Sequence, residues 1–269
     1  MFVPDRPIGP GQARAASGDD AIFEGIMLST RPLKQKTIGI LGGCSNVATV
    51  EYYRFLNDGV NDRLGGWEIA ETLIVGMNFG NIEAFIRQDD WNGLEAYMRD
   101  KVERLIAGGA DVILCVSNTL HRPLEKIMAD VSLPMIHIAD PTGQAMRDAG
   151  MKKVALFGTR PVMQMDYLKD RYRDRFGIET ISPTDAEQEE IDRIIFEELV
   201  KNTFTAQSKQ RYLAIAERMR REDGVEGLIL GCTEIFLLID QADMPDFPMF
   251  NTAKLHADAA VDFALEENR

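Results

Sequence analysis

Three short sequence landmarks occur twice along this chain, in the same order and at nearly the same spacing. The matched segments are 40–43 with 156–159, 114–119 with 229–234, and 134–137 with 248–251. Gly43 and Ser117 lie 74 positions apart in the first copy, and Thr159 and Cys232 lie 73 apart in the second. The next interval is 20 positions in the first copy and 19 in the second. Chance similarity between strand ends is the alternative, but the shared order and spacing favour two related lobes.

The landmarks lie in a chain whose apolar runs and amphipathic stretches alternate. Apolar runs typical of buried parallel strands cover residues 37–41, 72–75, 111–116, 135–138, 154–157, 227–230 and 249–250. Amphipathic stretches typical of helices include 49–64, 91–108, 123–131, 163–176, 187–200 and 205–223. This alternation predicts an α/β fold with two pseudo-symmetric lobes, each a parallel sheet flanked by helices. Because ligands bind beyond the carboxyl ends of parallel strands, we expect the active site in the cleft between the lobes.

The same pattern suggests boundaries for the parts of the chain. We expect an N-terminal extension in residues 1–35, a first lobe in 36–140 plus 246–269, and a second lobe in 141–245. The extension carries charged residues such as Asp5, Arg6 and Asp20 and no apolar core segment, so it does not resemble a signal peptide. The chain has no run of about 18 apolar residues, and we expect no transmembrane helix.

Composition narrows the classes of partner. The chain is 45% hydrophobic and 27% charged, as in ordinary globular domains. The net charge of −13 argues against nucleic acid or an anionic membrane as partner, but a pocket can still attract a small anion. Neither a GxGxxG fingerprint nor a GK(S/T) loop occurs, so nucleotide binding is poorly supported. The three cysteines form neither a metal-binding spacing nor an even disulfide set, and a reducing cytoplasm is the expected location.

Cys232 is the strongest candidate for chemistry. It follows the predicted strand 227–230 in the segment Gly-Cys-Thr-Glu, where Thr233 and Glu234 supply a hydroxyl and a carboxylate. A cysteine at a strand-to-helix turn gains thiolate character from the helix N-terminus, so we expect a catalytic base. A buried structural cysteine is the alternative. The repeat favours catalysis, because it sets Cys232 opposite Ser117, as a proton transfer between two faces of one substrate requires.

The matching loop of the first lobe consists of Ser117, Asn118 and Thr119. Small polar groups after a strand suit a carboxylate, through backbone N–H groups and side-chain donors. These residue types are also the usual helix caps, and the two roles are compatible. The loop 42–46 follows the first strand, and its glycines let the backbone approach a ligand closely. Cys44 in this loop has no neighbouring base, and Cys115, inside a strand, is expected in the core.

The remaining candidates come from loops and helix starts of both lobes. In addition to Asn118, Thr119, Thr233 and Glu234, the residues expected to bind substrate are Gly43, Ser45, Asn46, Asn78, Thr159 and Lys169. Lys169 could face an anionic group, and Arg160 and Arg171 compete for that role; a solvated helix face is the alternative for all three cations. His121, His137 and His256 show no metal-ligand spacing, so we expect no metal site. His137 suits a structural role as well as a catalytic one, and His256 could position a substrate group.

The order and spacing of three segments resemble the aspartate/glutamate racemase family, within the Asp/Glu/hydantoin racemase superfamily. The segments are 38–43 (IGILGG), 117–121 (SNTLH) and 231–235 (GCTEI), and the resemblance covers about residues 36–264. It implies two pseudo-symmetric lobes, a site in their cleft without a cofactor, a homodimer, and two cysteines that shuttle the substrate's α-proton, one per face. Here Ser117 occupies the first cysteine's position and Cys232 the second. This pattern resembles a branch with Ser or Thr in the first position, whose members resemble L-preferring amino-acid racemases.

The resemblance therefore implies a PLP-independent racemase acting on aspartate, glutamate or a similar small amino acid. The loops 118–119 and 43–46 would hold the α-carboxylate while Cys232 as thiolate removes the α-proton. A serine hydroxyl is far less acidic than a thiol, so Ser117 is expected to relay a proton through water or only to bind substrate. A decarboxylase or maleate isomerase of the same superfamily and a non-catalytic small-acid-binding protein are the alternatives.

Overall fold

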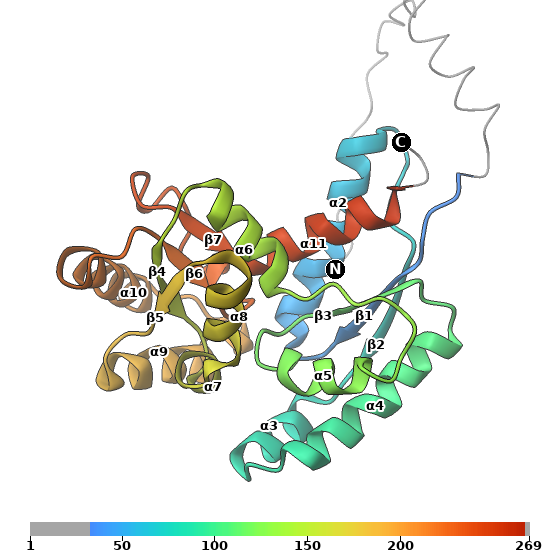
Figure 1. Ribbon diagram of the computed structural model, residues 1–269, viewed down its shortest axis with the longest axis horizontal. Helices are drawn as coiled ribbons and strands as arrows, with labels where there is room; N and C mark the ends of the chain where they lie inside the picture. The colour runs from blue at the N-terminus through green and yellow to red at the C-terminus, as the bar shows by residue number, and fades with distance from the viewer. Residues whose placement is uncertain (1–32, 267–269) are drawn as a thin grey trace, which may run out of the picture. The chain divides into compact units, whose positions relative to one another are not determined.

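The computed structural model describes residues 33–266, which form two parallel β-sheets flanked by helices (Figure 1). The first sheet has the order β2-β1-β3, with β1 (Ile38–Gly42), β2 (Thr72–Gly76) and β3 (Val112–Cys115). The second has the order β5-β4-β6-β7, with β4 (Lys153–Phe157), β5 (Glu179–Ile181), β6 (Leu228–Leu230) and β7 (Met249–Asn251). Every neighbouring pair is parallel. The predicted α/β class with two parallel sheets is confirmed.

The helices follow the strands in alternation. Those between the strands of the first sheet and just after it are α2 (Asn46–Leu64), α3 (Phe79–Arg87), α4 (Trp91–Ala107) and α5 (His121–Met128). Those that accompany the second sheet are α6 (Ala139–Asp148), α7 (Arg160–Gln164), α8 (Asp166–Phe176), α9 (Asp185–Glu197) and α10 (Ala206–Arg218). Short helical turns are η1 (Leu199–Lys201), η2 (Met219–Asp223) and η3 (Ile235–Leu237), and the last helix is α11 (Thr252–Ala264).

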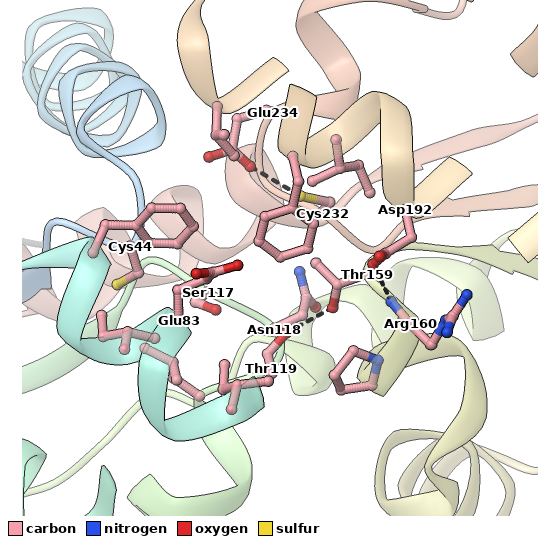
Figure 2. Close-up of a pocket in the computed structure, with 18 of the residues that line it drawn as sticks. Cys44, Glu83, Ser117, Asn118, Thr119, Thr159, Arg160, Asp192, Cys232 and Glu234 are labelled. Carbon is pink, nitrogen blue, oxygen red and sulfur yellow. Dashed lines mark hydrogen bonds between the residues drawn. The ribbon is translucent and has the colours of Figure 1, made fainter. Parts of the chain in front are cut away.

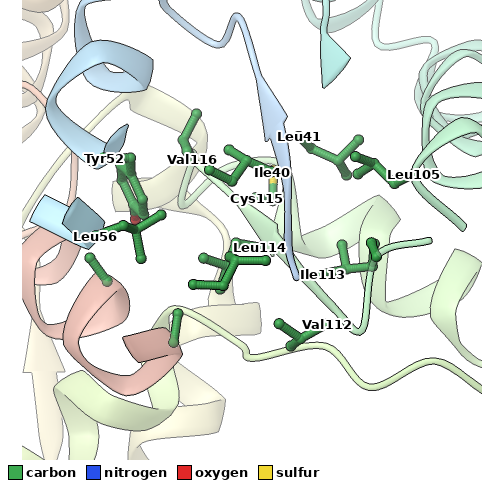
Figure 3. Packing of buried hydrophobic residues seen from close by; sticks show 14 of the residues in the cluster. Ile40, Leu41, Tyr52, Leu56, Leu105, Val112, Ile113, Leu114, Cys115 and Val116 are labelled. Carbon is green, nitrogen blue, oxygen red and sulfur yellow. The ribbon is translucent and has the colours of Figure 1, made fainter. Parts of the chain in front are cut away.

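The first sheet is buried on both faces. Ile40 of β1 pairs in register with Leu114 of β3, and both side chains are inaccessible to solvent. Tyr52 and Leu56 of α2 belong to the same apolar cluster (Figure 3). A sheet covered by helices on both sides needs strands that are apolar at nearly every position, which is why these runs were recognisable in the sequence. The second sheet separates two further apolar clusters in the same way.

Several elements differ from the sequence-based expectation. The run 135–138 forms only an isolated bridge between Met135 and Ile113, not a strand. Strand β5, which has three residues, and helices α3 and α6 were not among the elements named from the sequence. The single helix expected over 163–176 is two, α7 and α8, which are separated by extended backbone at Met165. The helix expected over 205–223 leaves α-helical geometry after Arg218 and continues as the π-helix η2.

The last part of the chain contributes to both lobes, which differs from the predicted boundaries. We expected residues 246–269 to belong to the first lobe. Within this range β7 pairs with β6 in the second sheet, whereas α11 packs against α2 and its buried side chains join the core of the first sheet. Residues 267–269, and residues 1–32 of the expected extension, lie outside the described part of the chain.

Side-chain caps fix where the helices beside the sheets begin. The Ser45 hydroxyl accepts a hydrogen bond from the Ala48 N–H at the start of α2, and the Asn78 side chain accepts one from the Gly80 N–H at the start of α3. Thr184 and Glu187 form a reciprocal capping box on α9. Each such cap satisfies an N–H that has no partner within the helix.

Candidate active site

The carboxyl ends of β3, β4 and β6 open onto one cavity of about 780 Å³. The segments that follow these strands line it: residues 117–120 after β3, 159–161 after β4 and 231–234 after β6. Helices α3 and α9 supply further walls, which meet where Phe79 stacks on Phe196 with ring centroids 6.2 Å apart. Loops from both sheets therefore share one pocket, at the edge where parallel sheets bind ligands.

Cys232 lies in this cavity and is 9% exposed (Figure 2). Its thiol donates a hydrogen bond to the Glu234 carboxylate, with Sγ 2.9 Å from Oε2. Burial raises the pKa of the Cys232 thiol well above its usual value, and the negative charge of Glu234 raises this pKa further. The expected thiolate activation by a helix N-terminus is wrong. Only the single turn η3 follows Cys232, and a carboxylate lies beside the sulfur.

Glu234 is the most enclosed acid of the site, with 1% of its surface exposed. Its carboxylate accepts hydrogen bonds from the Ser45 hydroxyl at 2.6 Å, the Cys232 thiol at 2.9 Å and the Thr233 hydroxyl at 3.2 Å. Burial raises the pKa of Glu234, although these three donors act in the opposite direction. A buried carboxyl with a raised pKa next to a thiol is able to exchange a proton with it.

The loop after β3 presents an amide and two hydroxyls to the cavity. The Asn118 amide donates to the Thr252 hydroxyl at 3.1 Å, while its Oδ1 is buried without a hydrogen-bond partner. The hydroxyls of Thr119 and Thr159 are 2.9 Å apart and join the loops of the two sheets. An unpartnered buried oxygen is unfavourable on its own, so Asn118 is suited to accept a hydrogen bond from a ligand's N–H.

A histidine holds the backbone of this loop. His121 donates from Nδ1 to the carbonyl of Ser117 at 2.7 Å and accepts at Nε2 from the N–H of Ile138 at 3.2 Å. Burial lowers the pKa of His121 to about 4, so the ring is neutral and can do both. The His121 ring therefore holds Ser117, the residue of the first lobe that corresponds to Cys232 in the repeat.

The cavity brings together seven of the residues singled out from the sequence. They are Ser117, Asn118, Thr119, Thr159, Cys232, Thr233 and Glu234. Five others, Gly43, Ser45, Asn46, Asn78 and Lys169, are not among the residues that line it. The contact with substrate expected for these five therefore has no support in the cavity's geometry.

Some of these five have structural roles beside the site. Ser45 holds Glu234 from the side of the first sheet, and Asn78 starts α3, whose residues form one wall. Gly43 has φ +83°, and a Cβ there would lie 2.1 Å from the carbonyl oxygen of Met77. Glycine is needed at this position because the backbones of two loops touch, and no ligand has to approach it.

Of the three cations considered from the sequence, Arg160 lines the cavity, whereas the favoured Lys169 does not. Lys169 lies on α8 away from the lining, and its competitor Arg171 is engaged by Asp140 and Glu125. Arg160 and Lys201 line the cavity, and neither forms an ion pair with any of residues 33–266. Lys201 lies in η1, after a helix whose cavity-facing side could not be identified before its packing was known.

The residues that form two walls of the cavity were not predicted from the sequence. Helix α3 contributes Phe79, Glu83 and Arg87, and α9 contributes Asp192 and Phe196. Burial raises the pKa of Asp192, which accepts a hydrogen bond from the Arg160 N–H at 2.6 Å. The only available signal was the amphipathic pattern of α9, and that pattern does not tell which polar residues border a pocket.

Two kinds of feature are absent from the part of the chain that the structure describes. No group of three or more His, Cys, Asp or Glu side chains is arranged to hold a metal ion within residues 33–266. No helix in that range is long and apolar enough to cross a membrane.

These features define a class: two-lobed α/β proteins with a buried thiol in a pocket shared by two parallel sheets. A family model described as Asp/Glu/hydantoin racemase matches residues 40–260, and the chain belongs to this family.

Solved structures agree with this assignment. A candidate Asp/Glu racemase from Yersinia pestis is 36% identical, covers 86% of this chain and 99% of its own, and superposes with a TM-score of 0.78. An aspartate racemase homologue from Pyrococcus horikoshii OT3 is 31% identical, covers 85% and 99%, and has a TM-score of 0.74. An aspartate racemase from Picrophilus torridus, at 21% identity, 85% and 94% coverage and a TM-score of 0.69, shares the fold.

Proposed function

We propose that this protein is an amino-acid racemase that needs no pyridoxal phosphate and acts on aspartate, glutamate or a similar small amino acid. The observation that carries the proposal is that Cys232 and Ser117, which follow matching strands of two different sheets, line the same cavity (Figure 2). Racemisation needs proton-transferring groups on both faces of Cα, and loops from two lobes can supply them. Membership of the racemase family supports the same reaction class.

Cys232 serves as the base on one face, and Glu234 activates it. The thiol already donates its hydrogen to the Glu234 carboxylate, so moving the proton across this bond produces a thiolate and a neutral carboxylic acid. Burial favours this neutral form of Glu234. The thiolate then removes the α-proton, and the electron pair of the C–H bond remains on Cα, where the α-carboxylate delocalises it.

Substrate binding uses polar groups of the residues that line the cavity. The Oδ1 of Asn118, which has no hydrogen-bond partner among the described residues, accepts from the α-ammonium group. The hydroxyls of Thr119 and Thr159 share one hydrogen bond, so the hydroxyl that accepts in it donates its own hydrogen to the α-carboxylate. Arg160 and Lys201 attract a second carboxylate, as the side chains of aspartate and glutamate would provide. This set accounts for an anionic substrate despite the negative net charge of the chain.

Ser117 makes the two faces unequal, and we place the chain in a branch of the family with Ser or Thr in the first catalytic position. A thiol gives up its proton far more readily than a hydroxyl. Exchange of the α-proton is therefore expected to be fast from the enantiomer that faces Cys232 and slow from the other. We assign the fast enantiomer as L.

The test is deuterium incorporation at Cα, followed by NMR in D₂O over L- and D-forms of aspartate, glutamate and other small amino acids. We expect exchange with at least one amino acid, faster from the L-form, and loss of at least 100-fold in Cys232→Ser, as is typical when a base is removed. Cys44→Ala and Cys115→Ala keep Cys232 and should retain most activity. Full exchange in Cys232→Ser, or release of CO₂ without exchange, would contradict the proposal.

Two further expectations belong to the same proposal. The protein acts as a homodimer: Val50 near the start of α2 and Trp67 and Ile69 just after its end are large apolar side chains exposed by 64%, 95% and 56%, and exposed apolar surface of this kind commonly packs against another chain. Light scattering at micromolar concentration should give twice the chain mass, and a single-chain mass would refute the dimer. The three cysteines are free, which suits a reducing cytoplasm, where fractionation would find the protein.

A further inference from the structure

A racemase that inverts Cα must deliver a proton on the face opposite Cys232, and this is the side of Ser117. A hydroxyl is a reluctant donor, because its pKa lies far above that of a thiol, which is about 8.5. If the Ser117 oxygen protonates Cα, the alkoxide left behind has to be neutralised in the same step. The first lobe therefore needs an acid within reach of Ser117.

Three acidic side chains from the first sheet's part of the chain, among the described residues, line the cavity. They are Cys44, Glu83 and Asp89. The contact of Cys44 with Cys115, together with burial, raises the pKa of the Cys44 thiol, so this thiol is a poor acid. Asp89 is exposed beyond the end of α3 and accepts a hydrogen bond from the Trp91 indole. Glu83 is the remaining acid.

Glu83 is fixed on a well-anchored helix. The backbone N–H of Asn78 donates to the Tyr97 hydroxyl at 2.9 Å, and the side chain of Asn78 caps α3. Arg87, one turn further along α3, forms an ion pair with the Glu83 carboxylate. This pair limits the conformations of Glu83 and stabilises the charged form that Glu83 takes after it gives up a proton. The Glu83 side chain is 28% exposed, and Figure 2 shows it pointing from α3 into the cavity, on the side where Ser117 and Cys44 also lie.

We propose that Glu83 is the proton reservoir of the first lobe, acting on the substrate through the hydroxyl of Ser117. The proposal rests on the racemase function proposed above. As Cys232 removes the α-proton and becomes a thiol, the Ser117 O–H bond breaks and a new C–H bond forms on the opposite face with the electron pair of Cα. The Ser117 oxygen takes the proton of the Glu83 carboxyl, which becomes a carboxylate. In the reverse direction Ser117 removes the α-proton and passes its own proton to the Glu83 carboxylate, and Cys232 returns the proton to Cα.

Glu83 is thus a positioning residue that acts through Ser117, and its loss should separate two reactions. In Glu83→Gln, Cys232 still exchanges the α-proton of the enantiomer that faces it, so deuterium enters without inversion. Formation of the opposite enantiomer should fall by about 10²- to 10⁴-fold in kcat, the usual contribution of general acid–base catalysis, with KM little changed. Deuterium NMR and chiral chromatography of the same reaction measure both rates.

The matched control is Glu95→Gln. Glu95 pairs with Arg99 at the same i,i+4 spacing on α4, its side chain is 26% exposed, and it lies outside the catalytic cavity. This variant loses a comparable ion pair and should invert substrate at the wild-type rate. Glu83→Asp keeps a carboxyl and should invert at a reduced but measurable rate, which provides a second variant if Glu83→Gln does not fold.

The most specific readout is rescue through the hydroxyl itself. A thiol at position 117 can donate without a relay, so Ser117→Cys in the Glu83→Gln background should restore inversion to within about tenfold of Ser117→Cys alone. The proposal is overturned if Glu83→Gln inverts substrate normally, if exchange and inversion fall together, or if the double variant stays as slow as Glu83→Gln. Failure of the racemase function would look different, since the wild type itself would then exchange no α-proton from either enantiomer.

Discussion

The thiol of Cys232 and the carboxylate of Glu234 titrate as one pair, because a single hydrogen bond of 2.9 Å joins them. Both pKa values are raised, the pKa of Glu234 by burial and that of Cys232 by burial and by the Glu234 charge. The form with one proton in the pair is the one that can act, since it interconverts between thiol–carboxylate and thiolate–acid. Adding a second proton in acid removes this base.

Replacing Glu234 by Gln should move the acidic limb of the pH–rate profile. In the wild type this limb follows the protonation of Glu234, so kcat/KM falls as pH drops through a pKa above the usual carboxyl value. In Glu234→Gln the thiol must ionise by itself, and a buried thiol does so at or above about pH 8.5. The limb should therefore shift to higher pH, with a loss of about 10- to 100-fold at pH 7. The measurement is kcat/KM between pH 5 and 10, and an unshifted limb would rule out proton sharing.

The secondary-structure elements that could be predicted are those with a hydrophobic pattern that is visible within their own residues. The strands β1, β3 and β4 are continuous apolar runs because helices cover their sheets on both faces, and such runs are visible without a structure. β5 was missed because only one residue of its three is buried. The run 135–138 is apolar enough for a strand, but only Met135 pairs with the sheet, so tertiary contacts overrode the local pattern.

The same division applies to the candidate site. The loops after β3 and β6 were found because strand ends in a repeat are predictable and parallel sheets bind ligands there. Glu83, Asp192 and Lys201 were not found, because the side of a helix that borders a pocket depends on how that helix packs. The expected activation of the Cys232 thiol by a helix N-terminus was wrong for a related reason: the burial of Cys232 and its contact with Glu234 arise only in the fold.

Gly43, just after β1, allows a test that separates the cost of a left-handed backbone from the cost of a steric clash. Gly43 and Gly150 both have positive φ, 83° and 74°, but a Cβ at Gly43 would meet the Met77 carbonyl at 2.1 Å whereas one at Gly150 has nothing within 4 Å. Gly150→Ala should lose about 1–2 kcal/mol for the left-handed backbone alone. Gly43→Ala should lose at least about 2 kcal/mol more, because two loops must separate. Urea unfolding of both variants measures the difference, and equal losses would contradict the steric explanation.

At the scale of the whole molecule, three buried histidines lie where the chain passes between its two sheets. His137 precedes α6 and His256 belongs to α11, the two helices on either side of the second sheet in the chain order. Their rings gather around His121, with centroids 4.5 Å and 5.6 Å from it. The His256 ring accepts from the Tyr52 hydroxyl at 2.9 Å and donates to the Ile136 carbonyl at 2.8 Å. These bonds require neutral rings, so the connection between the sheets depends on pH.

The free energy of unfolding should therefore fall on mild acidification. Burial lowers the pKa of His121 to about 4 and that of His256 to about 3, and it lowers the pKa of His137 as well. Because these values lie below the unfolded value of 6.5, the unfolded chain binds protons between pH 6.5 and about 4 that the folded chain does not. The contribution of the neutral histidines to the free energy of unfolding is fully present above pH 6.5. Between pH 7 and 5 the free energy of unfolding falls by about 2 kcal/mol per histidine.

Urea unfolding at pH 7, 6 and 5 measures this loss. The three histidines of the chain dominate this pH window because histidine is the side chain whose unperturbed pKa lies in it. The raised pKa of Glu234 acts with the opposite sign, since the folded protein then takes up a proton that the unfolded chain does not. Glu234→Gln removes that compensation, so its unfolding free energy should fall more steeply with acid than that of the wild type. A urea midpoint that stays constant from pH 7 to 5 in both proteins would show that the histidine cluster protonates without disturbing the fold.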